Sequence, residues 1–111
     1  MDRAKVGRKS RRKGKVGERE ISHILQERGY DAHRGQQFCG ANGDADVVGL
    51  PGVHLEVKRV ERLNIVNAME QSKSDARENE IPVVVHRRNG QEWLLTMRFT
   101  DYLDMYERSN G

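Results

Sequence analysis

Residues 42–58 have the sequence NGDADVVGLPGVHLEVK, in which an Asp, a Pro-Gly pair and a Glu-x-Lys triplet follow one another closely. The apolar runs on either side of the Pro-Gly pair predict two strands joined as a hairpin. Because side chains alternate along a strand, Glu56 and Lys58 project from the same face of the second strand. The hairpin brings Asp46 within reach of that strand, so we expect two carboxylates and one ammonium group to share a surface.

Carboxylate oxygens at this density suit Mg²⁺, for which Mn²⁺ can substitute. Such a cation and Lys58 would together stabilise the charge that builds on a phosphate during phosphodiester hydrolysis, and the metal would lower the pKa of a bound water. Asp44 competes with Asp46 as a ligand if the first strand begins early, since the two lie on the same face. The alternative interpretation is an ordinary Glu–Lys contact on an exposed strand pair.

The net charge of +3 conceals an uneven distribution along the 111 residues. Residues 1–15 contain eight Lys or Arg and one Asp, whereas residues 16–111 contain twelve Lys or Arg and sixteen Asp or Glu. We therefore expect a basic N-terminal arm, disordered until it meets phosphates, followed by one folded domain over residues 16–111. The alternative is a terminus that only aids solubility. The candidate DNA contacts in the arm are Arg8, Lys9, Arg11, Arg12, Lys13 and Lys15.

The composition indicates a protein of the cell interior. The sequence has no apolar run of membrane-spanning length, and its charged start lacks the apolar segment of a signal peptide. One cysteine, Cys39, fits a reducing compartment, so we expect a soluble cytoplasmic protein. The four histidines lack zinc spacing and are interpreted as surface or packing residues: His23, His33, His54 and His86.

Hydrophobic periodicity predicts three helices and five strands in an α-β-β-β-α-β-β-α order. A helix between the third and fourth strands permits a crossover to a parallel neighbour, which predicts an α/β fold with a mixed sheet flanked by helices. Asn89-Gly90 indicates a hairpin between the last two strands. The expected helices cover residues 16–28, 63–78 and a segment starting at Thr100, and the expected strands cover residues 30–34, 46–50, 53–60, 81–86 and 92–97.

The motif order resembles that of the PD-(D/E)xK nuclease superfamily, most nearly the archaeal-type Holliday junction resolvases and their small phage-like relatives. The likeness covers roughly residues 15–88 and includes the segment KGKVGERE at residues 13–20. It implies a restriction-endonuclease-like core, Mg²⁺-dependent cleavage of branched DNA in recombination and repair, and a homodimer with two sites. It also suggests a phage gene in a bacterial host.

By the same resemblance, the metal ligands would be Glu18, Asp46, Glu56 and the backbone carbonyl of Val57. Catalysis would involve these acidic residues with Lys58, and Gln71 on the second helix would touch the site. The position of Glu18 beside the apolar stripe of its helix favours it over Glu20, although both also suit the N-terminal turn of a helix. The alternative for Gln71 is an exposed helix residue.

Other positions complete or weaken the likeness. Arg34 and Arg59 resemble phosphate contacts, although a guanidinium binds carboxylates equally well. Where the family often has Ser-Gly near the scissile phosphate, this chain has Cys39-Gly40, and Ala45 replaces the Pro before the metal-binding Asp.

Two other functions stay open. A general nicking, repair or flap nuclease could carry the same site, because a fold does not select a substrate. A non-catalytic nucleic-acid-binding protein would use the basic arm but would leave Asp46, Glu56 and Lys58 without a role.

Overall fold

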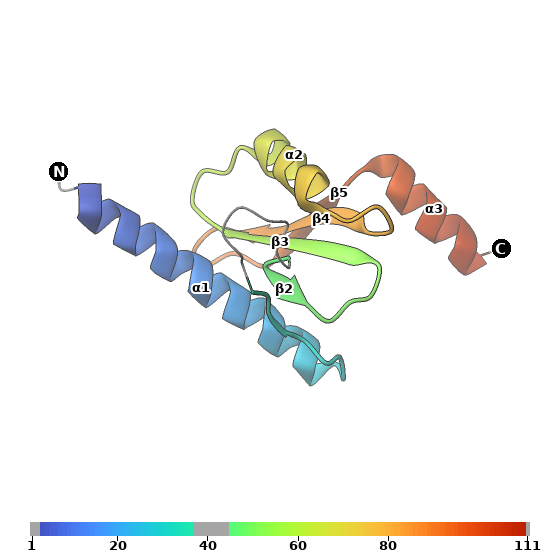
Figure 1. Ribbon diagram of the computed structural model, residues 1–111, viewed down its shortest axis with the longest axis horizontal. Helices are drawn as coiled ribbons and strands as arrows, with labels where there is room; N and C mark the ends of the chain where they lie inside the picture. The colour runs from blue at the N-terminus through green and yellow to red at the C-terminus, as the bar shows by residue number, and fades with distance from the viewer. Residues whose placement is uncertain (1–2, 37–44, 111) are drawn as a thin grey trace.

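A five-stranded mixed sheet with two helices packed on it forms the centre of the molecule (Figure 1). The structure is a computed structural model that describes residues 3–36 and 45–110, with side chains in the first helix from Gly14 onward. The elements are α1 (Arg3–Glu27), β1 (His33–Arg34), β2 (Val47–Val48), β3 (Val53–Arg59), α2 (Ile65–Asp75), β4 (Ile81–Arg87), β5 (Leu94–Met97) and α3 (Phe99–Asn110). The predicted α/β class and mixed sheet are confirmed.

The strands lie in the order β1-β2-β3-β4-β5, and only β3 and β4 run parallel. The connection between these two strands contains α2, as the crossover argument predicted. Between β2 and β3, the Val53 N–H donates to the Leu50 carbonyl at 3.1 Å, and Gly52 has φ +82°. This is the turn that a Pro-Gly pair favours, because only Gly adopts a positive φ without strain.

The two faces of β3 have different neighbours. Leu55 and Val57 belong to the apolar core, with Ile21 of α1 and Val83 of β4. His54, Glu56 and Lys58 point to the other face, on which α2 lies. Figure 1 shows α1 and α2 on opposite sides of the sheet. The polar face of β3 is therefore enclosed by α2 rather than left open to solvent.

The first helix begins at Arg3, which corrects the predicted start at residue 16. Ala, Lys and Arg favour helices, and a helix that has already formed extends by one hydrogen bond per residue, so the basic segment can continue α1. Disorder of the arm without nucleic acid stays a prediction. The predicted stop at Gly29 is confirmed: its φ is +93°, and the Tyr30 N–H donates to the Leu25 carbonyl at 3.0 Å.

The remaining elements differ from the prediction mainly in length. β1 and β2 each contain two residues, fewer than predicted. Gly49 ends β2 with φ +133°, and an added Cβ there would lie 2.6 Å from the Ala32 Cα, so the backbones approach too closely for any other residue.

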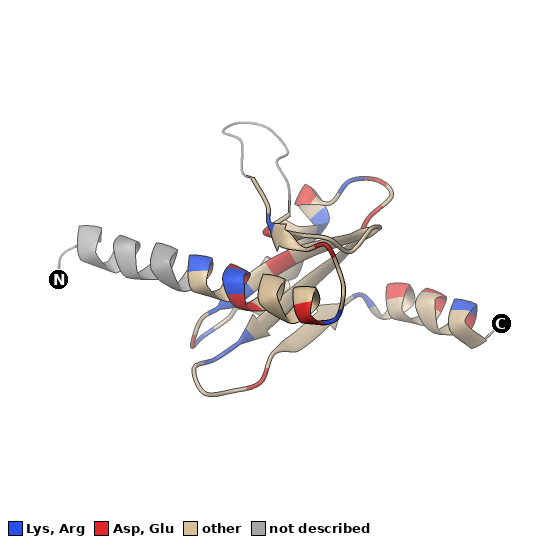
Figure 2. Cartoon of the chain, turned by 90° about the horizontal axis from the view of Figure 1, so that it is seen from below, with Lys and Arg blue, Asp and Glu red and all other residues tan. Residues whose placement is uncertain are grey.

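Helix α3 buries no side chain, and Figure 2, a view at right angles to Figure 1, shows it projecting from the body of the protein. Among the described residues, no helix has both the length and the apolar content to cross a membrane.

Candidate metal centre

Asp46 and Glu56 meet on neighbouring strands. Val47 pairs with Leu55, so the antiparallel register places Asp46 opposite Glu56, on the α2 side of the sheet. The Val57 N–H donates to Asp46 Oδ2 at 2.9 Å, which fixes one oxygen of that carboxyl group. Glu56 is 4% exposed. The predicted convergence of these two residues is thus present in the structure.

The environment of Asp46 favours its protonated form. Burial raises the pKa of Asp46 to about 7, and the charge of Glu56 acts in the same direction, although the Val57 N–H lowers the pKa. Two carboxylates in a partly dry site repel each other when both are ionised. A bound dication would remove that repulsion, so the donor set fits the predicted cation.

His54 is a member of this cluster that the sequence interpretation did not assign to it. It is 2% exposed, and its Nε2 lies 2.7 Å from Glu56 Oε1. Burial lowers the pKa of His54, but the hydrogen bond and charge of Glu56 raise it more, so the pKa lies above 6.5. Burial likewise raises the pKa of Glu56, while the His54 hydrogen bond holds it below 4.5. The signal available in the sequence was spacing, because residues two apart on a strand share a face.

Asp75, near the end of α2, was also missed. A ligand atom from each of His54, Glu56 and Asp75 can lie within 4.8 Å of the others, which makes this group able to hold a metal ion. The Ser72 hydroxyl donates to the Val83 carbonyl at 3.0 Å and holds this part of α2 against the sheet. No sequence motif marks Asp75, because its position depends on how α2 docks.

Glu18 lies near this centre but has a partner of its own. Its charge contributes to the raised pKa of Asp46, which places it in the same acidic neighbourhood. Its Oε2 accepts a hydrogen bond from Arg34 Nε at 2.8 Å. The predicted metal ligand and the predicted phosphate contact are thus paired with each other in this structure.

Glu20, the other candidate glutamate of α1, has its partners on the sheet. Its carboxylate accepts hydrogen bonds from Arg87 Nη2 at 3.0 Å and from Trp93 Nε1 at 3.1 Å, and Arg87 also lies over the Trp93 ring. Arg59 Nε is 3.8 Å from Glu20 Oε1. Arg59 therefore faces α1, on the opposite side of β3 from Lys58, and does not lie beside the carboxylate pair.

The other predicted residues are placed as follows. Lys58 is half-buried on the face of Glu56, and its charge helps lower the pKa of Glu56. Gln71 is exposed on α2, about one turn before Asp75. Lys15 is exposed. Asp44, Cys39 and Gly40 lie outside the described residues, as do the side chains of Arg8, Lys9, Arg11, Arg12 and Lys13.

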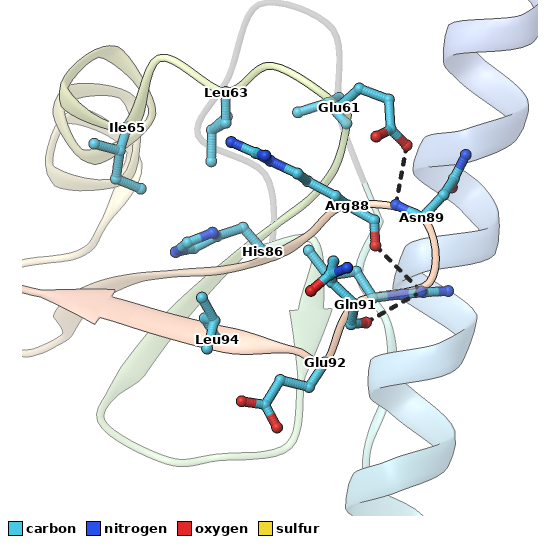
Figure 3. Close-up of a pocket in the computed structure, with 11 residues that line it drawn as sticks. Glu61, Leu63, Ile65, His86, Arg88, Asn89, Gln91, Glu92 and Leu94 are labelled. Carbon is cyan, nitrogen blue, oxygen red and sulfur yellow. Dashed lines mark hydrogen bonds between the residues drawn. The ribbon is translucent and has the colours of Figure 1, made fainter.

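Two cavities flank the cluster along β3. The larger, of about 640 Å³, lies at the carboxyl ends of β3 and β4 and is lined by His86, Arg88 and Glu61 among others (Figure 3). His86 pairs in register with Lys58, so this cavity begins next to the lysine. The smaller, of about 370 Å³, is lined by His54 and Glu80 at the other end of the strand. The acidic cluster thus lies between the two openings.

Comparison with known proteins finds no matching family model and no matching curated sequence. The function of the protein is therefore inferred from the geometry of the site.

Proposed function

We propose that the protein is a metal-dependent nuclease that hydrolyses phosphodiester bonds in DNA. The observation that carries this proposal is the meeting of Asp46 and Glu56 on adjacent strands, with Lys58 on the same face. Two carboxylates and a lysine in this arrangement offer a cation site and a positive charge for one phosphate group.

In this proposal, Asp46 and Glu56 hold Mg²⁺, with Mn²⁺ as a substitute, and the Val57 carbonyl is a further ligand. The bound cation supplies a water of lowered pKa and countercharge for the phosphate. The Val57 N–H orients the Asp46 carboxylate through Oδ2. The Lys58 ammonium faces the phosphate and stabilises the charge that develops on its oxygens.

Glu18 becomes a further metal ligand when Arg34 binds a phosphate oxygen in place of the Glu18 carboxylate. The Arg34 guanidinium holds Glu18 at 2.8 Å in the protein alone, and a phosphate oxygen is an equally good acceptor for it. Binding of DNA would therefore occupy Arg34 and release the Glu18 carboxylate toward Asp46. Gln71 contacts the bound substrate from the exposed side of α2.

The proposed substrate is branched DNA, cut by a homodimer with one site per strand. The basic residues of the arm bind the backbone without reading bases, which suits recognition by shape. The cavity next to Lys58 contributes Arg88 and His86 to the same path. A general nicking or repair nuclease is the second candidate, because the same cluster could cut any duplex.

The test is cleavage of labelled four-way junction, flap, linear duplex and single-stranded DNA in Mg²⁺ and in Mn²⁺. We expect Asp46→Asn, Glu56→Gln and Lys58→Met to reduce the cleavage rate by roughly 100-fold or more, since each removes a group that acts on the transition state. Glu27→Gln is the matched control: it removes an exposed carboxylate at the end of α1 that lines neither cavity, and it should leave the rate unchanged.

The outcomes separate the candidates. Symmetric cuts confined to the junction support the resolvase-like function. Cuts spread over all substrates support the general nuclease. Tight DNA binding with no cleavage in either metal refutes the enzyme and leaves a nucleic-acid-binding protein.

A further inference from the structure

The face of β3 beneath α2 presents a second set of ligand atoms besides the Asp46–Glu56 pair. His54 and Glu56 come from β3, and Asp75 comes from α2. Their ligand atoms all lie within 4.8 Å of one another, and His54 Nε2 lies 2.7 Å from Glu56 Oε1. This spacing is short enough for one ion to contact all three residues after small side-chain rotations.

The charges around His54 favour a cation. Glu80 adds a third carboxylate, with Oε1 at 3.8 Å from His54 Nδ1. Glu80 Oε1 also accepts the Arg77 backbone N–H at 2.8 Å, so its position is fixed by its own turn rather than by the cluster. Three carboxylates around one buried imidazole are costly to hold in a partly dry site unless further positive charge is present.

A cavity borders one member of the cluster, His54. The cavity of about 370 Å³ is lined by His54 and Glu80 together with Ala45, which precedes Asp46. An ion can therefore reach the imidazole from the side opposite Lys58. The donors themselves lie on a central strand and a docked helix, which hold ligand geometry better than loops do.

We propose that His54, Glu56 and Asp75 form a second cation site, selective for a transition-metal dication such as Co²⁺ or Zn²⁺. An imidazole nitrogen with two carboxylates suits these ions, whereas Mg²⁺ prefers oxygen ligands alone. Glu56 is shared between the two sites: Oε1 faces His54, and the same carboxylate also pairs with Asp46. The second site rests on the proposed nuclease site only through the shared residue Glu56.

The test is titration of the full-length protein with Co²⁺, followed by calorimetry and by the visible absorption of the bound ion. We expect wild-type protein to bind two ions. His54→Gln and Asp75→Asn should each weaken one of them by about tenfold or more and alter the absorption band. Asp46→Asn should leave the His54-dependent ion in place. Glu80→Gln is the matched control, since it removes a neighbouring carboxylate outside the ligand group and should change affinity far less than either ligand variant.

The test of the second site measures Co²⁺ binding and requires no DNA cleavage. If both ligand variants fold and bind Co²⁺ like the wild type, the second site is refuted. The second result concerns a wild-type protein that binds a single ion. If Asp46→Asn abolishes binding of that ion and His54→Gln weakens it, His54 only positions Glu56. The second site is then also refuted. A protein without nuclease activity that still loses one ion in His54→Gln would refute the proposed function and support the cation site.

Discussion

Asp46 links the pH to the stability of the protein. Its pKa is raised from 3.8 to about 7, so between these values the folded protein holds a proton that the unfolded chain has released. Stability of the metal-free protein therefore falls as the pH rises through this window. The raised pKa of His54 acts in the same direction: its contribution is complete below 6.5 and is lost as the pH rises through the folded value. Glu56, with a lowered pKa, contributes stability above 4.5 that is lost only as the pH falls below that value.

Asp46→Asn should therefore flatten the pH dependence of stability. In the presence of a chelator, we expect the wild-type free energy of unfolding to fall by on the order of 2 kcal/mol between about pH 5 and about pH 8, and the variant to lose much less. Urea denaturation at the two pH values measures this difference. Asp104→Asn, at an exposed position on α3, is the control and should keep the wild-type slope. If stability of Asp46→Asn falls with pH as steeply as that of the wild type, the raised pKa does not belong to Asp46.

At the scale of elements, α1 is held to the β4–β5 end of the sheet by Glu20. Its carboxylate accepts hydrogen bonds from Arg87 and Trp93 across the gap between helix and sheet. Burial raises the pKa of Glu20, but these hydrogen bonds and the Arg87 charge hold it below 4.5. The ionised carboxylate is therefore the form that joins the two elements.

Glu20→Gln should lower the free energy of unfolding by about 1 kcal/mol, because it weakens charge-assisted hydrogen bonds at a partly exposed site. Glu27→Gln is the matched control: it removes an exposed carboxylate at the end of the same helix that pairs only with His23 among the ion pairs described. Urea denaturation at neutral pH compares the two variants. Equal effects would show that Glu20 does not hold α1 to the sheet.

At the scale of the whole molecule, α3 leaves an apolar surface exposed. It consists of Phe99, Tyr102, Met105 and Tyr106, each between 43% and 72% exposed. Tyr102 and Tyr106 lie on one side of α3, with ring centroids 6.2 Å apart. At roughly 100 Å² for each side chain, the four cover about half of the area of about 800 Å² that each partner buries in a stable interface. This surface is where we place the contact of the proposed homodimer.

Sedimentation equilibrium should then show a monomer–dimer equilibrium. Phe99→Ser and Tyr106→Ser should each raise the dimer dissociation constant by about tenfold or more, since aromatic anchors dominate such interfaces. Tyr30→Ser, at a comparably exposed tyrosine beyond the end of α1, is the control and should leave the dissociation constant unchanged. A wild-type protein that stays monomeric at every concentration would contradict the dimer.

The sequence determined the features that depend on neighbouring residues. Alternation along β3 places Glu56 and Lys58 on one face, the Pro51-Gly52 turn sets the register that brings Asp46 opposite Glu56, and Gly29 ends α1. Each follows from strand geometry or turn chemistry within one hairpin or one helix end, so a local pattern is enough to predict it.

Only the tertiary structure decided which distant side chains complete the cluster. Asp75 reaches His54 because the α2 crossover docks on the polar face of β3, and Arg59 faces away because α1 covers the other face. Glu18 meets Arg34, and Glu20 meets Arg87, because α1 packs against the sheet. These contacts join segments whose separation in sequence carries no periodic signal, and packing of the apolar core sets them.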